Sequence, residues 1–511
     1  MNFGILNILS WFLGAILAGF ACLFMCFVLY LHYIHKKNAH LPGPPRSSFI
    51  FGNLPELWKY KKATDGGTLL EFVLEKRLEY GPVLLLTWFH RAVVYLGDPS
   101  YIREVFVNNH THLHKPPFIY NKFGFIFGER GMGYGLVTNI DESSWRNRRN
   151  TMSAAFHRKC LKDFTTHFND VSNRFLIRID KVADKGEPVS MVAEFAKVTL
   201  EAISQVSFNI NTNAIEDPES PFPSAVRNYL QGVQANLDIP LSSALLGIFQ
   251  FTPFQSASKR VQIDAARFLR KFALDCISTR KKDIAEEKDV PNDLLSLLIN
   301  DGSLTSEDIT DEFLTVFLAG QETTANSLAF TLYEILSNPH VEAKLLKEIK
   351  DVMGDREEVK YDDLAKLKYT GQILEESLRK HPIASTPVRI LEKEITVGGY
   401  RIPEGNGIVS FSMLFGRNPE IWNDPDVFDP ERFADPASIP NLSMIHFPFS
   451  VGPRNCIGQT FAKFESKVIL AKLFQKFQFK LLPNQTDKIL GRLTLSPRDG
   501  VMCKVRRLPE Q

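Results

Sequence analysis

The sequence predicts a mainly α fold with small β-sheets, an α+β body that follows one membrane-spanning helix. Three observations lead to this class. The first residues form a long apolar run without charges. Helical periodicity dominates residues 160–300 and returns after residue 304, and short strand-like runs occur at residues 83–97 and 386–412 between turn residues. Strands this short form small sheets beside helices, so we expect one mostly helical body.

The composition is that of a globular protein. The chain has 511 residues, of which 44% are hydrophobic and 23% are charged, and its formal net charge is +2. So small a net charge creates no global field for nucleic acid, and we expect no nucleic-acid partner. The six cysteines show neither a disulfide framework nor a Cys-x-x-Cys pair, which favours a reducing, cytosol-facing compartment.

Residues 1–35 are predicted to be a transmembrane signal-anchor. They contain no Asp, Glu, Lys or Arg, and the run exceeds both the roughly 20 apolar residues of a membrane span and the roughly 7–15 of a cleavable signal peptide. The first basic residues, Lys36 and Lys37, follow it, so the positive-inside rule puts the body in the cytosol. Residues 36–60, with the stretch "LPGPP", are predicted to be a stiff proline-rich linker, and residues 61–511 the body.

The first part of the body mixes strands, loops and helices. Residues 83–97 are predicted to be two strands around a turn, residues 110–140 to be rich in loops, and residues 160–300 to be helical. The apolar, uncharged stretch at residues 239–251 is equally compatible with burial and with a dip into the membrane, and both interpretations stay open.

The second part begins with a long helix. Thr305 and Asp308 form a capping-box pattern at its start, and the Asn-Pro pair after Ser337 ends it. Further helices follow, and residues 386–412 are strand-like with turns at "GGY" and "PEGNG". An amphipathic helix is predicted after Cys456.

Cys456 lies in the stretch "FPFSVGPRNCIGQ", residues 447–459, just before that helix. Free N–H groups and the dipole at a helix N-terminus help a thiol to ionise. Zinc would need about four protein ligands, and only His446 is near in the sequence. No His–Asn pattern supports a nucleophile, and a buried cysteine acting as a small apolar residue is the common alternative.

The residues around Cys456 resemble a known loop. Five positions spell F-x-x-G-x-R-x-C-x-G: Phe449, Gly452, Arg454, Cys456 and Gly458. This string is similar to the heme loop of the heme-thiolate monooxygenases, the cytochrome P-450 superfamily, and the resemblance runs from Pro42 to the C-terminus. It implies the cytochrome P-450 fold and a heme b cofactor whose iron is a metal ion bound by the Cys456 thiolate. Phe449, Arg454 and Gly458 would also contact the cofactor.

The long helix carries "AGQET", which is similar to the family's oxygen-binding motif. Its matching positions are Ala319, Gly320, Glu322 and Thr323. A buried carboxylate is costly unless it is hydrogen-bonded or linked to water, and glycine inside a helix costs on the order of 1 kcal/mol against alanine. The resemblance explains both: the small residues leave room for dioxygen, Thr323 hydrogen-bonds it, and Glu322 with water supplies protons. Glu322 and Thr323 are therefore the predicted catalytic residues.

Three charged residues match the family's structural triad. Glu376 and Arg379 share one helix face, and "FDPERF" supplies Arg432. The resemblance implies that they form ion pairs beneath the heme loop.

Four residues match the family's heme propionate contacts: Trp145, Arg149, Arg389 and Arg454. Gly416 departs from the pattern, because many relatives carry histidine there, and this leaves one propionate hydrogen bond unaccounted for.

Four strings look most like the cholesterol 24-hydroxylase group: "LPGPPRSSFIFGNLPELW", "FGERGMGYGLV", "WRNRRNTMSAAF" and "FLAGQETTANSLAFTLYE". This implies a single-pass endoplasmic reticulum enzyme that inserts one oxygen atom of O2 into a C–H bond of an apolar lipid, a sterol.

NADPH–cytochrome reductase would deliver electrons from NADPH, with cytochrome b5 as a further candidate donor. A basic docking face for the reductase is predicted from Arg146, Arg148, Lys463, Lys467 and Lys472. Small or apolar side chains are predicted to line the substrate site: Phe123, Phe125, Ile126, Ala319, Thr386 and Leu495.

Three alternatives stay open. A heme-thiolate isomerase or dehydratase would tend to lose the acid–alcohol pair, which is intact here. A hydroxylase of fatty acids or xenobiotics would keep the same motifs. A non-enzymatic heme-binding or sensor protein would need neither the proton relay nor a substrate cavity.

Overall fold

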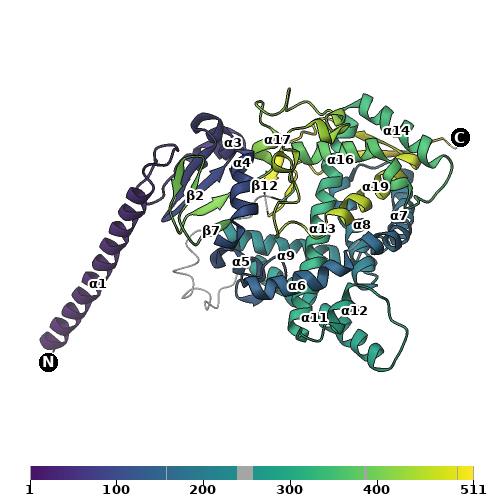
Figure 1. Cartoon of the computed structure of the whole chain (residues 1–511). Coiled ribbons are helices and arrows are strands. Elements are labelled where there is room, and N and C mark those ends of the chain that lie inside the picture. The colour runs from purple at the N-terminus through teal and green to yellow at the C-terminus, as the bar shows by residue number, and fades with distance from the viewer. Residues whose placement is uncertain (1, 157, 239–256, 385–387, 492, 510–511) are drawn as a thin grey trace. The chain divides into compact units, whose positions relative to one another are not determined.

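Two units divide the described chain. The computed structural model describes residues 2–509 apart from residues 157, 239–256, 385–387 and 492 (Figure 1). One unit comprises Met1–His114 and Thr386–Ser410, and the other comprises Lys115–Ser385 and Phe411–Gln511. Helices predominate and the sheets are small, so the predicted α+β class is confirmed.

The first unit holds a five-stranded sheet of order β1-β2-β10-β7-β3. β1 and β2 form an antiparallel hairpin, as predicted, and Phe89 turns between them with a φ of +55°. β10 lies parallel to β2 and antiparallel to β7, so the second strand-like stretch joins the same sheet. The elements are α1 (Asn2–Lys37), α2 (Leu54–Ala63), α3 (Leu69–Tyr80), β1 (Val83–Trp88), β2 (Arg91–Leu96), α4 (Pro99–Ile102), η1 (Arg103–Asn108), η2 (His110–His112), β3 (Leu113–His114), β7 (Arg389–Leu391), β8 (Ile395–Val397), β9 (Tyr400–Ile402) and β10 (Gly407–Val409).

The last turns of α1 pack on this unit. The span Trp11–Lys37 is long and apolar enough to cross a membrane, and its first part is exposed. Further along, Leu31 and His35 are buried, and the His35 ring lies 5.1 Å from the Phe49 ring. Asn406 Nδ2 donates to Asn38 Oδ1 at 2.6 Å. The end of the helix is thus built into the sheet unit, beyond the expected boundary at residue 35.

The proline-rich stretch after α1 lies along β1. The Leu85 N–H donates to the Pro42 carbonyl at 2.7 Å. A Cβ atom on Gly43 would lie 2.2 Å from the Leu85 carbonyl oxygen, so only glycine allows this approach. The sheet therefore holds this stretch along part of its length.

The second unit contains most of the helices. Its elements are α5 (Pro117–Gly124), β4 (Phe125–Ile126), β5 (Glu129–Arg130), α6 (Glu142–Ala155), α7 (Arg158–Lys185), β6 (Val189–Ser190), α8 (Met191–Phe208), α9 (Pro221–Asp238), α11 (Ala257–Ala285), α12 (Leu294–Asn300), α13 (Ser306–Ser337), α14 (Pro339–Met353), α15 (Asp363–Lys366), α16 (Lys368–Lys380), α17 (Met413–Gly416), η3 (Pro430–Phe433), η4 (Pro436–Ser438), α18 (Leu442–Ile445), α19 (Gln459–Lys476), β11 (Phe477–Leu481), β12 (Ile489–Gly491), β13 (Leu495–Pro497) and β14 (Met502–Arg507).

Helix α13 confirms the predicted long helix and its capping box. The Asp308 N–H donates to Thr305 Oγ1 at 3.1 Å, and the Thr305 N–H donates to the Asp308 carboxylate at 3.0 Å. Residues 309–318 are all buried, because α13 packs against α8, α11, α16 and α19. The helix is therefore a central support of the unit.

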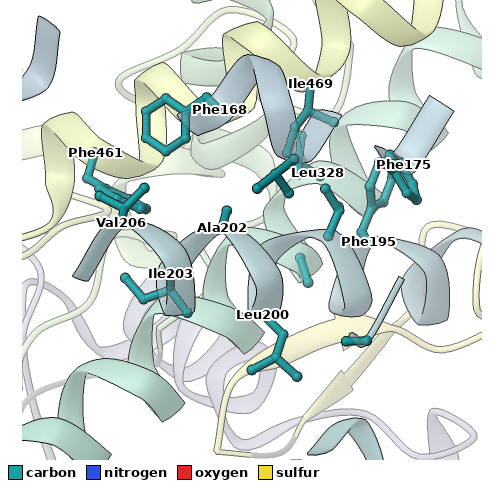
Figure 2. Packing of buried hydrophobic residues seen from close by; sticks show 14 of the residues in the cluster. Phe168, Phe175, Phe195, Leu200, Ala202, Ile203, Val206, Leu328, Phe461 and Ile469 are labelled. Atoms are coloured by element: carbon teal, nitrogen blue, oxygen red, sulfur yellow. The ribbon is translucent and has the colours of Figure 1, made fainter. Parts of the chain in front are cut away.

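Helices α7, α8, α13 and α19 share one hydrophobic core (Figure 2). The ring of Phe461 on α19 lies 5.0 Å from the ring of Phe168 on α7. Ala202 of α8 and Leu328 of α13 lie in the same cluster. This packing fixes the start of α19, which directly follows the cysteine loop.

Two further expectations concern residues 110–140 and 239–251. The first stretch holds more regular structure than predicted, because α5 and the β4–β5 pair lie within it and contact α9. Residues 239–251 lie outside the described residues.

Candidate active site

The loop that carries Cys456 is closed by its own backbone. The Cys456 N–H donates to the Phe449 carbonyl at 2.8 Å, and the Asn455 N–H donates to the Gly452 carbonyl at 3.1 Å. Gly452 has a φ of +74°, which other residues avoid. Gly458 has a φ of −86° and forms the N-cap of α19, so it needs no such freedom. Cys456 therefore lies two residues before the N-cap of a helix.

The surroundings of the thiol combine enclosure with access. Burial raises the pKa of the Cys456 thiol, while the Gly458 N–H and the Arg149 guanidinium act to lower it. The expected help from the helix start is thus present but smaller than the effect of burial. The residue nevertheless keeps exposed surface. A bound metal ion would reverse the balance, because metals deprotonate coordinating thiols outright.

The donor set around Cys456 fits an iron porphyrin. Within the described ranges, no three His, Cys, Asp or Glu side chains gather in a way that could hold a metal ion. A single thiolate suits a metal that brings its other ligands with it, as heme iron does. The exposed surface of Cys456 leaves its thiol accessible to such a group.

Residues 319–323 interrupt the burial of α13 near its middle. Ala319 is exposed, and Gly320, Glu322 and Thr323 are partly exposed. Thr323 Oγ1 donates to the Ala319 carbonyl at 2.8 Å, so the hydroxyl keeps its lone pairs as acceptors. A Cβ atom on Gly320 would lie 2.6 Å from the Ile203 side chain of α8. Gly320 therefore serves close helix packing, and the expected room for dioxygen stays a prediction.

Trp145, Arg149 and Arg454 come together beside the cysteine loop. Arg149 donates from Nη1 to the Asn455 carbonyl at 2.7 Å and from Nη2 to Asn455 Oδ1 at 2.8 Å. The Arg454 guanidinium lies 3.8 Å from the Trp145 ring centroid, and its Nη2 donates to Glu142 Oε2 at 2.5 Å. Arg454 thus has a carboxylate partner from the protein itself, in addition to its expected role toward a propionate.

Arg389 belongs to the first unit, where it lies buried on β7. Its Nη1 donates to the Val388 carbonyl at 3.0 Å. Its place in the propionate clamp stays a prediction.

Glu376, Arg379 and Arg432 also meet. Arg379 donates from Nε and Nη2 to the Glu376 carboxylate at 2.6 and 2.8 Å, and both side chains are fully buried. Arg432 Nε lies 3.4 Å from Glu376 Oε1. The Asp429 N–H donates to the same oxygen at 2.9 Å, so Glu376 joins α16 to the segment that begins η3.

Gly416 packs directly on this triad. Arg379 Nη1 donates to the Gly416 carbonyl. A Cβ atom on Gly416 would lie 2.2 Å from the Arg379 carbonyl oxygen. The departure from the family pattern thus has a local reason, because a side chain here would displace the backbone of the triad.

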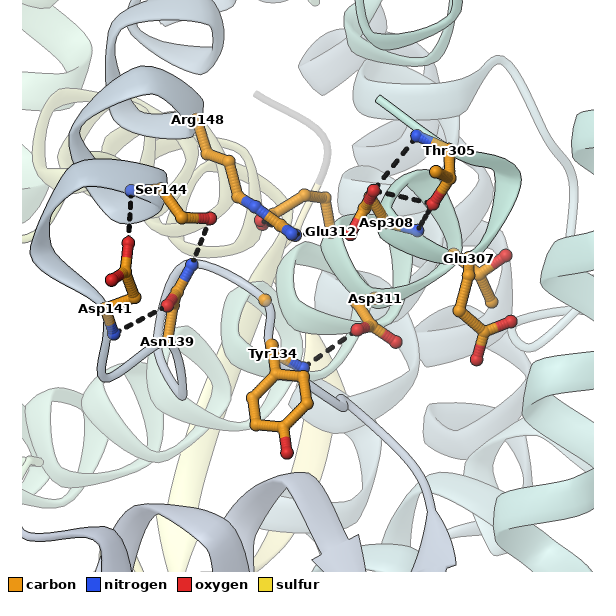
Figure 3. A network of polar contacts seen from close by, with 12 residues as sticks. Tyr134, Asn139, Asp141, Ser144, Arg148, Thr305, Glu307, Asp308, Asp311 and Glu312 are labelled. Carbon is orange, nitrogen blue, oxygen red and sulfur yellow. Dashed lines mark hydrogen bonds and ion pairs between the residues drawn. The ribbon is translucent and has the colours of Figure 1, made fainter. Parts of the chain in front are cut away.

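A buried polar network fixes α6 on α13 (Figure 3). Arg148 donates to Asp308 Oδ1 at 2.6 Å and to Glu312 Oε1 at 3.1 Å, and the Leu136 N–H donates to Glu312 Oε2 at 2.9 Å. Burial raises the pKa of Glu312 to about 7, although the Leu136 N–H and Arg148 oppose this. The network orients the helix that carries Trp145.

The predicted basic docking face is therefore wrong in its composition. Arg148 and Lys472 are buried, and Lys472 Nζ donates to a backbone carbonyl at 2.7 Å. Lys463 and Lys467 are only partly exposed. Of the five residues, Arg146 alone is exposed, and it pairs with a glutamate at 3.1 Å. Most of these cations hold the fold together instead of facing a partner.

The predicted substrate residues divide into two groups. Ala319 is exposed and Phe123 and Phe125 are partly exposed, whereas Ile126 and Leu495 are buried. Burial does not decide whether a residue lines a substrate site, so the role of all five stays a prediction. Successive side chains of a strand point to opposite faces, so β4 turns Phe125 outward and Ile126 into the core. Thr386 lies outside the described residues.

The segments that contain Ile383 and Leu495 lie together. The Leu495 N–H donates to the Ile383 carbonyl at 2.8 Å. Thr494 Oγ1 accepts from Asn326 Nδ2 on α13 at 3.1 Å. The turn before β13 therefore lies beside the C-terminal half of α13.

Sequence reasoning missed several buried ionisable residues. Glu465 on α19 is fully buried, and burial raises its pKa far above the usual range, although the Thr324 hydroxyl acts against this. Glu375, which contacts His446 and ion-pairs with Lys463, was also missed. A charged residue on the apolar face of a helix is the signal that could have identified Glu465. Glu375 has no such signal, because its sequence pattern is that of an ordinary exposed helix residue.

Comparison with known proteins identifies the family. The family model described as "Cytochrome P450" matches residues 42–504. The chain belongs to the cytochrome P450 family. The heme-thiolate chemistry of that family makes this P450 an oxidoreductase, a monooxygenase that uses heme b with a cysteine thiolate ligand, O2 and NADPH-derived electrons.

Curated relatives of this P450 come from several groups. Cytochrome P450 3A28 of Bos taurus is 30% identical over 87% of this chain and 85% of its own length. Cytochrome P450 4c21 of Blattella germanica is 29% identical over 88% of this chain and 89% of its own. LUTEIN DEFICIENT 5, a chloroplastic protein of Arabidopsis thaliana, is 29% identical over 84% and 73%. These relatives do not single out one substrate.

Proposed function

We propose that this P450 hydroxylates an apolar lipid of the sterol class and that Cys456 supplies the thiolate that binds its heme iron. One observation carries the proposal: an enclosed but accessible thiol at the start of α19, in a unit where α13 presents an accessible Ala319. When bound, the heme activates dioxygen, and the thiolate favours O–O cleavage. Arg149 beside the loop and Arg454 within it would hold the heme carboxylates. Arg389 keeps the propionate role that the resemblance implies.

Glu322 and Thr323 are assigned the proton relay. They are partly exposed neighbours in the middle of a mostly buried helix. Thr323 donates its only hydroxyl proton to the Ala319 carbonyl, so it acts toward the site as an acceptor that can hold a water molecule in place. Glu322 supplies a titratable carboxyl beside it. Positioned proton transfer of this kind contributes roughly 10²–10⁴-fold in rate.

The substrate class is argued from the residues that remain accessible. Phe123, Phe125 and Ala319 offer apolar surface, which suits a large hydrocarbon such as a sterol. The resemblance of four strings to the cholesterol 24-hydroxylase group favours the same class. Fatty acids and xenobiotics are the competing substrates for the same residues.

The location and the electron donor are part of the same proposal. α1 would anchor the protein in the endoplasmic reticulum membrane as a single span, with the catalytic units in the cytosol. Electrons would come from NADPH–cytochrome reductase, with cytochrome b5 as a further donor.

A substrate screen tests the proposal. Purified protein with heme is titrated with sterols, fatty acids and small polar compounds while the Soret band is recorded. The best ligand is then incubated with reductase and NADPH. We expect sterols to shift the band at the lowest concentrations, and mass spectrometry to find one added oxygen atom. Tight binding of small polar compounds alone would refute the sterol class. Product formation without NADPH consumption would favour an isomerase.

A further inference from the structure

We propose that Glu375 is a positioning residue that clamps both ends of the cysteine loop and, with Lys463 and Phe449, holds the Cys456 thiolate in place. The inference rests on the proposed role of Cys456 as the iron ligand. It concerns a second carboxylate on α16, next to the triad residue Glu376, that the triad does not use.

The two oxygens of Glu375 reach opposite ends of the loop. Oε2 lies 2.9 Å from His446 Nε2, at the C-terminal end of α18, and Oε1 lies 2.5 Å from Lys463 Nζ, in the first turns of α19. The chain between His446 and Lys463 contains the whole loop, including Cys456. One carboxylate therefore closes the loop across its base.

The charges of this cluster are matched and mostly enclosed. The side chains of Glu375, His446 and Lys463 are 24%, 7% and 28% exposed. Burial alone would raise the pKa of Glu375, but the His446 hydrogen bond and the Lys463 charge lower it to about 2. The carboxylate is thus ionised at neutral pH, where its ion pair with Lys463 persists.

Lys463 connects the clamp to the ligand residue. Its Nζ lies 5.4 Å from the centroid of the Phe449 ring, within the range of a cation–π contact. The Phe449 carbonyl accepts the Cys456 N–H at 2.8 Å. Three contacts therefore connect Glu375 to the backbone of Cys456. They are the ion pair of Glu375 with Lys463, the cation–π contact of Lys463 with Phe449, and the hydrogen bond from the Cys456 N–H to the Phe449 carbonyl.

The clamp differs from the triad in what it holds. Glu376 ties α16 to the segment before η3, whereas Glu375 ties α16 to both flanks of the loop. Loss of the triad should affect the fold as a whole. Loss of the clamp should keep the fold intact, because the loop retains its own backbone hydrogen bonds. The loop should nevertheless become less firmly held, because its two ends are no longer joined through Glu375.

The test measures the thiolate bond directly. Ferrous holoenzyme with carbon monoxide has a red-shifted Soret band only while the thiolate is bound, and the rate at which this band converts to the unshifted form reports how firmly the loop holds it. Glu375→Gln keeps the size of the side chain and removes its charge. We expect conversion about tenfold faster than in the wild type, because a broken, partly enclosed ion pair costs less than a fully buried one.

A matched carboxylate provides the control. Glu348 accepts the Tyr369 and Thr370 N–H groups at 2.5 and 2.8 Å at the start of the same helix, α16. Glu348→Gln should lower resistance to unfolding and leave the conversion rate of the Soret band unchanged. An equal acceleration in Glu348→Gln would reduce Glu375 to general support of the helix and overturn the inference.

A second variant guards against misfolding of the first. Lys463→Gln changes a partly exposed residue and should accelerate conversion by a similar factor, and the double variant with Glu375→Gln should be no faster than either single variant, because both remove the same contact. The inference would be overturned if the two substitutions accelerated conversion independently, so that their factors multiplied in the double variant. It would also be overturned if both single variants converted at the wild-type rate. A wild-type protein without the red-shifted band, or a Cys456→His variant that keeps it, would instead refute the proposed role of Cys456.

Discussion

Removal of the Thr323 hydroxyl should uncouple electron use from product formation while leaving the fold almost unchanged. The hydroxyl donates to the Ala319 carbonyl one turn back at 2.8 Å. Such a bond contributes about 0.5–1.5 kcal/mol net, and alanine recovers up to about 0.7 kcal/mol through its higher helix propensity. The free energy of unfolding of Thr323→Ala should therefore stay within about 1 kcal/mol of the wild type.

The effect on catalysis should be far larger. Positioned proton transfer contributes roughly 10²–10⁴-fold in rate, so even the lower limit lets reduced oxygen escape as hydrogen peroxide before it is protonated productively. We expect the ratio of hydroxylated product to NADPH consumed to fall about tenfold or more, with peroxide making up the difference. The assay records NADPH, peroxide and product in the same reaction with reductase.

Thr331 is a matched control on the same helix. Its Oγ1 donates to the Ser327 carbonyl at 2.7 Å, the same bond one turn back, and its side chain is fully buried. Thr331→Ala should cost at least as much stability as Thr323→Ala and keep the wild-type ratio of product to NADPH. The reasoning is refuted if both variants uncouple alike, or if Thr323→Ala and Glu322→Gln both keep the wild-type ratio.

Four further outcomes are expected. Cys456→His should lose the red-shifted Soret band of the ferrous carbon monoxide complex, and a retained band would exclude it as the ligand. Glu376→Gln should lower the free energy of unfolding by about 3–5 kcal/mol, because it strands a fully buried arginine; denaturant titration measures this. Gly416→Ala should cost about 1–3 kcal/mol, because its Cβ would lie 2.2 Å from a backbone oxygen; a melting temperature equal to the wild type would contradict the packing. Deletion of residues 1–35 removes buried side chains of α1 and should lower the melting temperature, whereas deletion of residues 1–26 should not.

Local patterns were enough to predict the elements that carry the site. The capping box at Thr305 and Asp308, with the Asn-Pro pair after Ser337, predicted both ends of α13, because these features act within one turn of the chain. The loop around Cys456 and the triad of Glu376 with its arginines were likewise visible as short strings, and the structure brings the members of each string together.

Contacts between distant segments could not be predicted in this way. The sequence predicts Arg148 as a surface cation, because its partners Asp308 and Glu312 lie on another helix far along the chain. Gly320 was assigned to dioxygen, and only the approach of Ile203 from α8 reveals a packing role. The roles of Arg148 and Gly320 both depend on which other helix packs against their own. A single sequence does not specify that packing.

The seating of the last turns of α1 has a mechanical consequence. A helix joined to its domain by a flexible tether can tilt in a bilayer without moving the domain. Here Leu31 and His35 are buried against the first unit, and Asn38 is hydrogen-bonded to Asn406. Under the proposed topology α1 therefore acts as a lever: the thickness of the bilayer sets the tilt of the helix, and that tilt sets the angle at which the five-stranded sheet meets the membrane surface.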